Sequence, residues 1–218
     1  MKRIILLATV AVFLQVAVYA QPVHDRGVVP VAVTLNRVMR LNITSGGNME
    51  FVFNSIKEYE NGLNSGGASS FYQTAFYVAA SNDWNLVMGA EDATLLPTDH
   101  IAAVAGIPTN SMALNNVGFN IVHVAGGTLA NANYATPVAG FPTTVAALAQ
   151  YTGAAPLVIA SAAAPAGDAG DALDNSFQIN WRAGTAEGTM TATTILHANI
   201  FPDRYVTNVF MDIQVATQ

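Results

Sequence analysis

Acidic residues give the sequence its most regular set of candidate metal ligands. Asp168, Asp171 and Asp174 recur at intervals of three residues in a stretch that also contains glycine. Carboxylate oxygens are preferred ligands of Ca²⁺, and glycine permits the tight turns that gather ligands around an ion. The spacing differs from an EF-hand loop, which places its oxygen ligands at alternate positions and ends on a glutamate. Two interpretations stay open: a calcium site, and a solvated loop that keeps a weakly charged surface soluble.

The other titratable residues form no set that is typical of an enzyme. Glu58 and Glu60 flank a single residue, and paired carboxylates divide acid and base roles in glycosidases. Two carboxylates this close in a polar stretch are more typical of a solvated surface. The four histidines have no local metal-binding spacing, and the sequence has neither a cysteine nor a G-x-S-x-G nucleophile elbow. We therefore expect no enzymatic activity and no bound cofactor other than the calcium ion considered above.

Two tryptophans allow a choice between sugar binding and core packing. Trp84 and Trp181 could offer flat faces on which a sugar ring stacks. Both stand in stretches where apolar and polar residues alternate, beside other apolar residues. Because aromatic rings bury a large apolar area, the sequence favours the core for both side chains.

The elements that would position these residues are strands. Residues 205–215 alternate strictly, with Val209, Met211, Ile213 and Val215 on one face, which is typical of a strand with one buried face. A short helix is predicted at residues 143–150, and a hairpin turn at residues 45–48. The predicted strands are residues 28–44 (one bent strand or two), 49–53, 71–80, 84–88, 118–124, 156–160, 177–182, 188–197 and 205–215.

Many short strands separated by Gly, Asn, Ser and Pro indicate an all-β fold. We predict an Ig-like Greek-key β-sandwich with long Ala/Gly-rich loops. The sandwich is expected to be a single domain over residues 21–218. Residues 92–175 would be its loop-rich portion, because charge nearly vanishes there and no charged linker separates them.

The first twenty residues have the pattern of a secretory signal peptide. Lys2 and Arg3 precede a mostly apolar run, and Val18-Tyr19-Ala20 is a small-x-small cleavage site. Cleavage between Ala20 and Gln21 would release a chain without a membrane span, because no later apolar stretch is long and uninterrupted. We expect the protein to be secreted through the periplasm to the cell surface or the medium.

Composition restricts the partners. The chain has 8 basic and 14 acidic residues, so removing Lys2 and Arg3 changes the formal net charge from −6 to −8. This balance argues against nucleic acid, which requires clustered Lys and Arg. Charged residues make up only 10% of the chain, against about 25% in typical soluble domains. A weakly charged surface of this kind favours association with copies of the same chain or with other surface proteins.

A candidate for that association lies near the expected mature N-terminus. Val29, Val31, Val33 and Leu35 share one face of an alternating apolar stretch. Such a strand can add to the open edge of a neighbouring subunit's sheet, with main-chain hydrogen bonds supplying affinity and alternate side chains setting the register. The alternative is that the strand completes the sheet of its own domain.

Four stretches resemble strands of known surface proteins. One of them, residues 48–54 (NMEFVFN), stands where such domains often have an x-I-x-F strand. Residues 77–90 (YVAASNDWNLVMGA) resemble the W-x-L strand of WxL-type surface domains, and residues 177–185 (FQINWRAGT) with residues 201–215 resemble their closing strands. The same closing strands are similar to those of pilin-like sandwiches in adhesive fibres. The resemblance implies a secreted Ig-like sandwich that works at the cell surface in a structural or adhesive role.

The sequence therefore supports two functions above others. The first is a structural subunit of a cell-surface fibre or pilus-like assembly, joined by strand addition. The second is a monomeric secreted adhesin that binds glycan or another surface protein through the loops of residues 92–175. A secreted hydrolase has the least support, because no nucleophile, acid or base set can be named.

Overall fold

A computed structural model of the chain describes residues 29–65, 71–99, 110–124, 144–153, 157–159 and 169–216. The chain divides into two compact units, Met1–Leu35 and Asn36–Gln218. The described part of the first unit, residues 29–35, contains neither helix nor strand. Every helix and strand described below belongs to the second unit.

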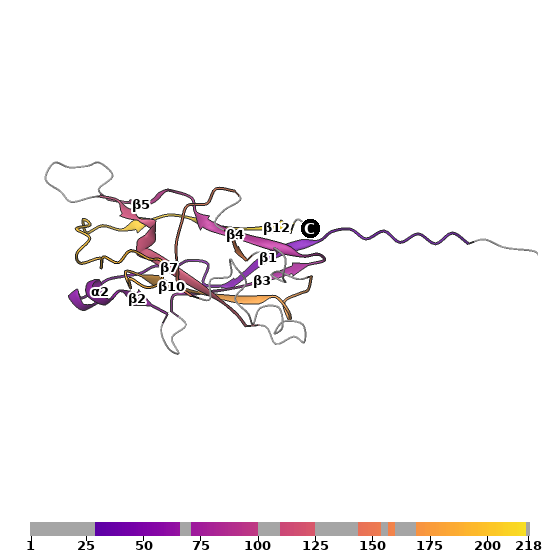
Figure 1. Ribbon diagram of the computed structural model, residues 1–218, viewed down its shortest axis with the longest axis horizontal. Coiled ribbons are helices and arrows are strands. Elements are labelled where there is room, and N and C mark those ends of the chain that lie inside the picture. Colours follow the sequence, from indigo (N-terminus) through magenta and orange to yellow (C-terminus); the bar gives the residue numbers. More distant parts are fainter. Residues whose placement is uncertain are drawn as a thin grey trace, which may run out of the picture. The chain divides into compact units, whose positions relative to one another are not determined.

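The larger sheet of the second unit is antiparallel throughout. Its strands follow the order β1-β3-β10-β7-β8, and β2 pairs with the C-terminal end of β10 (Figure 1). The strands are β1 (Met39–Ser45), β2 (Leu63–Asn64), β3 (Gln73–Ala80), β7 (Val117–His123), β8 (Ala146–Ala147) and β10 (Ser176–Ala183).

Two smaller antiparallel sheets complete the fold. One has the order β12-β4-β9 and the other β11-β5-β6. Their strands are β4 (Trp84–Ala90), β5 (Thr94–Pro97), β6 (Met112–Ala113), β9 (Leu157–Ile159), β11 (Tyr205–Val206) and β12 (Val209–Val215). The described helices are the α-helix α2 (Ile56–Asn61) and the 3-10 helix η2 (Leu114–Asn116).

The core lies between the large sheet and β4. Along β3 and β10 every second residue is buried, as a strand with one buried face requires. Phe177 on β10 stacks on Phe76 of β3 at 5.3 Å between ring centroids and meets the edge of Trp84 on β4 at 5.8 Å. Trp84 is fully buried and Trp181 is 7% exposed, so the prediction that both tryptophans pack in the core is confirmed.

The all-β prediction is confirmed, and most predicted strands are present. Residues 71–80, 84–88, 118–124, 156–160 and 177–182 each contain a strand, with ends shifted by one or two residues where the structure describes them. The stretch 205–215 contains two strands, β11 and β12, that pair with different neighbours. Residues 92–175 also hold β5 and β6, which sequence analysis assigned to loops.

The helix predicted at residues 143–150 is wrong in its described part, residues 144–150. Ala146 and Ala147 form β8 and pair with Phe119 and Gly118 of β7. Leu148 follows with only 3% of its surface exposed. Here burial beside an available strand edge outweighs the helix preference of alanine and leucine, because tertiary packing can override intrinsic propensity.

The strand predicted at residues 188–197 is also wrong. Local hydrogen bonds form turns instead, from Met190 N to Glu187 O and from His197 N to Thr194 O. Met190 and Ile195 are 7% and 8% exposed, so turns rather than a strand carry these apolar side chains inward. The threonine content of this stretch misled the prediction, because β-branched residues are enriched in strands but do not exclude turns.

The strand predicted at residues 28–44 is confirmed only from Met39 onward. The hairpin predicted at residues 45–48 is wrong: β1 pairs with β3, and residues 49–53 form no ladder with β1. Sequence analysis also missed α2. Ser55 caps that helix in a capping box, in which Ser55 Oγ accepts from Glu58 N at 3.3 Å and Glu58 Oε2 accepts from Ser55 N at 2.9 Å.

Candidate functional site

The predicted strand-addition residues are exposed and unpaired. Residues 29–35, here called the N-terminal segment, belong to no strand. Val29, Val31, Val33 and Leu35 are 83%, 84%, 78% and 90% exposed. The segment carries no charged residue. Four large apolar side chains at alternate positions are therefore available for burial against another surface.

A second stretch alternates without a strand partner. Residues 47–53, here called the edge segment, follow β1. Met49, Phe51 and Phe53 are partly buried and pack against the core, whereas Glu50 and Val52 are exposed. Among the described residues, the main chain of this segment has no backbone–backbone hydrogen bond. The edge segment therefore has the side-chain pattern of a strand. Val52 O accepts from Asn54 Nδ2 at 3.3 Å, and the other main-chain groups of the segment have no hydrogen bond to the described residues and are open to a further strand.

The chain turns away from the large sheet at Gly46, directly after β1, and the edge segment follows this turn. The φ of Gly46 is +67°, in the left-handed region that glycine adopts readily. A Cβ on Gly46 would lie 1.9 Å from the carbonyl oxygen of Gln73. Thr74 Oγ1 donates to Gly46 O at 2.7 Å and accepts from Trp181 Nε1 at 2.9 Å. The turn is thus fixed to the buried core, which holds the edge segment in place.

The edge segment forms one wall of a cleft of about 530 Å³. The opposite wall comes from the residues around β11 and the start of β12, including Val209 and Met211. The floor is made by core residues such as Trp181 and Leu148. The volume is within the range of about 300–1,000 Å³ found for sites that hold a drug-sized ligand.

Charged residues in the cleft lining are few and stand at its mouth. They are Glu50, Asp203 and Arg204. Arg204 Nε donates to Glu50 Oε1 at 3.0 Å, so an ion pair joins the two walls. Both side chains are more than half exposed, and such surface pairs contribute little to stability. Burial raises the pKa of Tyr205, with the nearby Asp203 as a second cause.

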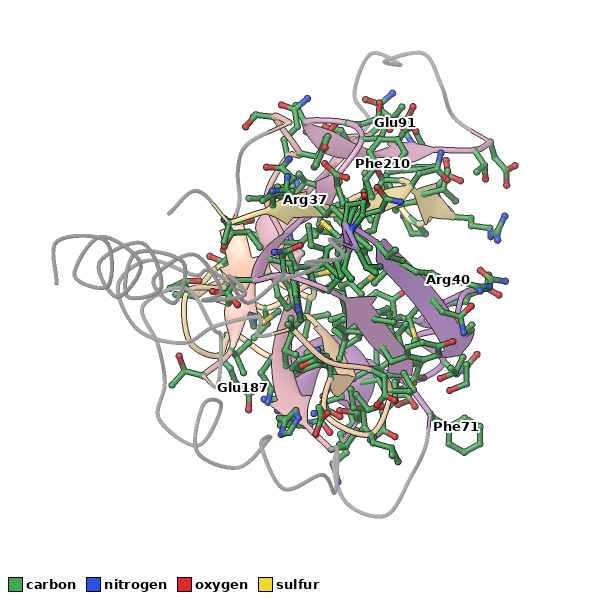
Figure 2. All side chains as sticks on the ribbon, turned by 90° about the vertical axis from the view of Figure 1, so that its right-hand side faces the viewer. Arg37, Arg40, Phe71, Glu91, Glu187 and Phe210 are labelled. Atoms are coloured by element: carbon green, nitrogen blue, oxygen red, sulfur yellow. The ribbon has the colours of Figure 1, made fainter. Side chains whose placement is uncertain are left out.

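The strands β1 and β12, which adjoin the cleft, are edge strands of their sheets. Among the described strands, β1 pairs only with β3, and β12 pairs only with β4. The two strands contact each other, and Figure 2 shows Arg40 on β1 and Phe210 on β12 at the surface. Ile43 on β1 is 47% exposed, and Val209 on β12 is 36% exposed. Apolar side chains therefore remain uncovered where the large sheet and the β12 sheet end.

The predicted calcium ligands are only partly described. Asp168 lies outside the described residues. Asp171 Oδ1 accepts a hydrogen bond from Leu173 N at 2.8 Å, and its carbonyl accepts from Asn175 N at 2.8 Å. His123 Nε2 lies 2.6 Å from the carbonyl oxygen of Asp174. Within the described ranges, no three His, Cys, Asp or Glu residues gather around a common point. The described contacts of Asp171 are those of a turn.

Glu58 and Glu60 both lie in α2, where Glu60 is exposed and Glu58 has a capping role. Glu58 belongs to the capping box of α2, and its carboxylate also accepts from Asn54 N at 2.6 Å. That hydrogen bond is the main reason why the pKa of Glu58 is lowered; burial opposes it, and two hydrogen bonds with Ser55 add to it. A carboxylate held in its ionised form to cap a helix has a structural role. The signal cleavage residues Ala20 and Gln21 lie outside the described residues.

Sequence analysis identified the two alternating stretches but not their relation to a cleft. It predicted residues 49–53 as a paired strand, whereas they are an unpaired edge. It named neither Glu50 nor Arg204. The break at Gly46-Gly47 was the available signal, because two glycines can turn a chain out of a sheet as well as close a hairpin.

Comparison with known proteins does not place the chain in a family. No protein-family model and no curated protein matches it. None of the described helices is long and apolar enough to cross a membrane.

Proposed function

We propose that this chain is a secreted structural subunit of a cell-surface fibre or pilus-like assembly, and that subunits join by strand addition. The observation that carries the proposal is the N-terminal segment. It is uncharged, unpaired and alternating, and its four large apolar side chains are at least 78% exposed. An apolar stretch that stays exposed favours binding to a partner.

The energetics favour a strand added to a sheet edge over a loose apolar contact. Burying one Val or Leu side chain contributes about 1.5–3 kcal/mol, so four contribute roughly 6–12 kcal/mol. Association costs about 4–15 kcal/mol in lost translational and rotational freedom. The side chains alone therefore do little better than offset that cost, and main-chain hydrogen bonds to an open edge are needed for a stable joint.

Two further features of the sequence support this role. The N-terminal pattern of residues 1–20 is that of a secreted protein, and a weakly charged surface reduces repulsion between packed copies. We infer that the three sheets form an Ig-like Greek-key sandwich, in keeping with the resemblance to WxL-type and pilin-like strands. We assign the chain no catalytic role.

The experiment compares the chain from Gln21 with a V31D/V33D variant of it. Light scattering and negative-stain electron microscopy report the assembly. We expect oligomers or filaments for the unsubstituted chain and monomers for V31D/V33D, because a buried carboxylate without a partner is costly. The matched control is Ala32→Asp, which puts a charge on the opposite face of the same segment and should retain assembly. A monomeric unsubstituted chain, or equal assembly of all three, would contradict the proposal.

A second function is favoured by a cluster of amides on the outer face of the large sheet. Gln73 Nε2 and Gln178 Nε2 both donate to Asn180 Oδ1, at 3.1 and 2.7 Å, and Arg182 Nη2 donates to Asn120 Oδ1 at 3.4 Å. Converging polar side chains of this kind can orient a sugar. In this alternative the chain is a monomeric adhesin. Polysaccharide binding that is lost in Asn180→Ala, with no assembly, would favour it.

A further inference from the structure

We propose that the cleft beside the edge segment is the receptor that binds the N-terminal segment of a second copy of this chain. This inference rests on the proposed function and names its acceptor site. The incoming strand would hydrogen-bond to the main chain of residues 47–53 and place Val29, Val31, Val33 and Leu35 in the cleft.

The first argument is the open main chain of the edge segment. A strand joins a sheet by exchanging N–H and C=O hydrogen bonds with an unpaired edge. Residues 47–53 offer such an edge, since no backbone–backbone hydrogen bond occupies it among the described residues. The N-terminal segment, residues 29–35, has the same length and is itself unpaired. Each stretch therefore lacks the partner that the other could supply.

The second argument is the chemistry of the two surfaces. The lining of the cleft combines polar groups with apolar side chains, among them Met49, Phe51, Phe53, Val209 and Met211, and the apolar surface is slightly the larger. The N-terminal segment has four large apolar side chains and no charge, so its insertion would bury no unpaired ion.

The third argument is reach, and it selects a second copy over the chain's own segment. Leu35 precedes Met39 by four residues, which span at most about 14 Å. The other end of β1, at Ser45, lies roughly 20 Å from Met39 at about 3.3 Å per residue. Phe51 stacks on Tyr72 at 4.5 Å, just before β3 starts, so the edge segment continues beyond Ser45. The chain's own Leu35 cannot reach that far, whereas a second copy is not limited by this tether.

The ion pair at the mouth of the cleft bears on how the strand enters. Glu50 and Arg204 stand on opposite walls and are joined by one exposed hydrogen-bonded contact. An exposed pair exchanges readily with water and is screened by salt. An entering strand can therefore part the pair at little cost, and the apolar lining below it then becomes accessible.

The test uses engineered disulfides, since the natural sequence contains no cysteine. A chain carrying Val31→Cys is mixed with a tagged chain carrying Val209→Cys, at the cleft, or Val124→Cys. Val124 is 52% exposed, follows β7 and is not among the residues that line the cleft. We expect roughly tenfold more mixed disulfide dimer with Val209→Cys, because binding raises the effective concentration of the two thiols. Equal yields would overturn the inference.

A peptide arm separates this inference from the proposed function. A labelled peptide of residues 28–36 is added to the full chain carrying V31D/V33D, whose own segment cannot compete. We expect binding that is lost in the additional variant Val209→Lys and kept in Val124→Lys, with unchanged Tm for both. Peptide binding to this variant, together with an unsubstituted chain that stays monomeric, would keep the cleft and reject the fibre. Assembly that depends on Val31 and Val33 but not on Val209 would keep the fibre and reject the cleft. No peptide binding rejects the cleft.

Discussion

Two regions of this molecule share one sequence pattern and differ in their main-chain partners. On β10, Phe177, Ile179 and Trp181 alternate with polar residues, and the strand pairs with β3 on one side and β7 on the other. In the edge segment, Met49, Phe51 and Phe53 alternate in the same way, but no described strand pairs with them.

The difference teaches what alternation does and does not determine. It decides which side chains face the core, because successive side chains of an extended chain point in opposite directions. It does not decide whether a neighbouring strand is present, since that depends on residues far away in the sequence. The N-terminal segment is the extreme case, in which the pattern is present and its four large apolar side chains remain exposed.

The largest expected effect comes from the fully paired region. Phe177 is completely buried, and Phe177→Ala should lower the free energy of unfolding by about 3–5 kcal/mol. Val31→Ala should leave the free energy of unfolding of the monomer unchanged, because that side chain is 84% exposed. Urea denaturation of both variants at a concentration too low for assembly measures the contrast. A large loss in Val31→Ala would mean that the N-terminal segment belongs to its own domain.

Gly46 separates the paired part of β1 from the open edge, and its substitution is expected to have the next largest effect. Gly46→Ala places a side chain at φ +67° and brings its Cβ against Gln73 O. The positive φ alone should cost about 1–3 kcal/mol, and the clash of the Cβ with Gln73 O should add to that loss. Thermal unfolding measures it. Gly153→Ala is the matched control, since Gly153 also has a positive φ, at +83°, but a Cβ there would meet no atom within 4 Å.

The strands that sequence analysis predicted well are those that pair with a neighbouring strand of the same alternating apolar pattern. Residues 71–80 and 177–182 form β3 and β10 because each buries its apolar face against the same core. The predictions at residues 143–150 and 188–197 failed because local preference competed with an available strand edge or with turns. The apolar face of residues 29–35 was visible in the sequence. The cleft was not, because its walls come from residues 47–53 and 200–209, which are distant in the chain.

The cap of α2 supplies the next effect, because this short helix directly follows the edge segment. Ser55→Ala removes the oxygen that accepts from Glu58 N, and should cost about 0.5–2 kcal/mol. Ser55→Asp, which retains a capping oxygen, is the control and should lose little. Denaturant unfolding monitors both. If Ser55→Ala also changes peptide binding in the cleft, then α2 helps to hold the edge segment in position.

The same cap predicts a small dependence of stability on pH. Hydrogen bonds from Asn54 and Ser55 hold the pKa of Glu58 below its ordinary value in the folded chain. A lowered folded-state pKa means that the stabilisation is fully present above the ordinary pKa and is lost as pH falls through the lowered value. Glu58→Gln should therefore make the free energy of unfolding less dependent on pH in the acid range. A pH dependence that is unchanged by this substitution would show that other carboxylates govern it.

The Glu50–Arg204 ion pair should have the smallest effect on stability and is therefore the most selective probe of the cleft. Glu50→Gln removes an exposed pair, and such pairs contribute about 0.2–1 kcal/mol. If the ion pair has no role at the cleft entrance, Glu50→Gln should leave the rate of peptide binding unchanged. If it spans the entrance to an acceptor site, Glu50→Gln should speed binding of the 28–36 peptide, and added salt should speed it in the unsubstituted chain but not in the variant. Stopped-flow fluorescence at two salt concentrations distinguishes the two cases, because the pair is a contact between the cleft walls that salt weakens.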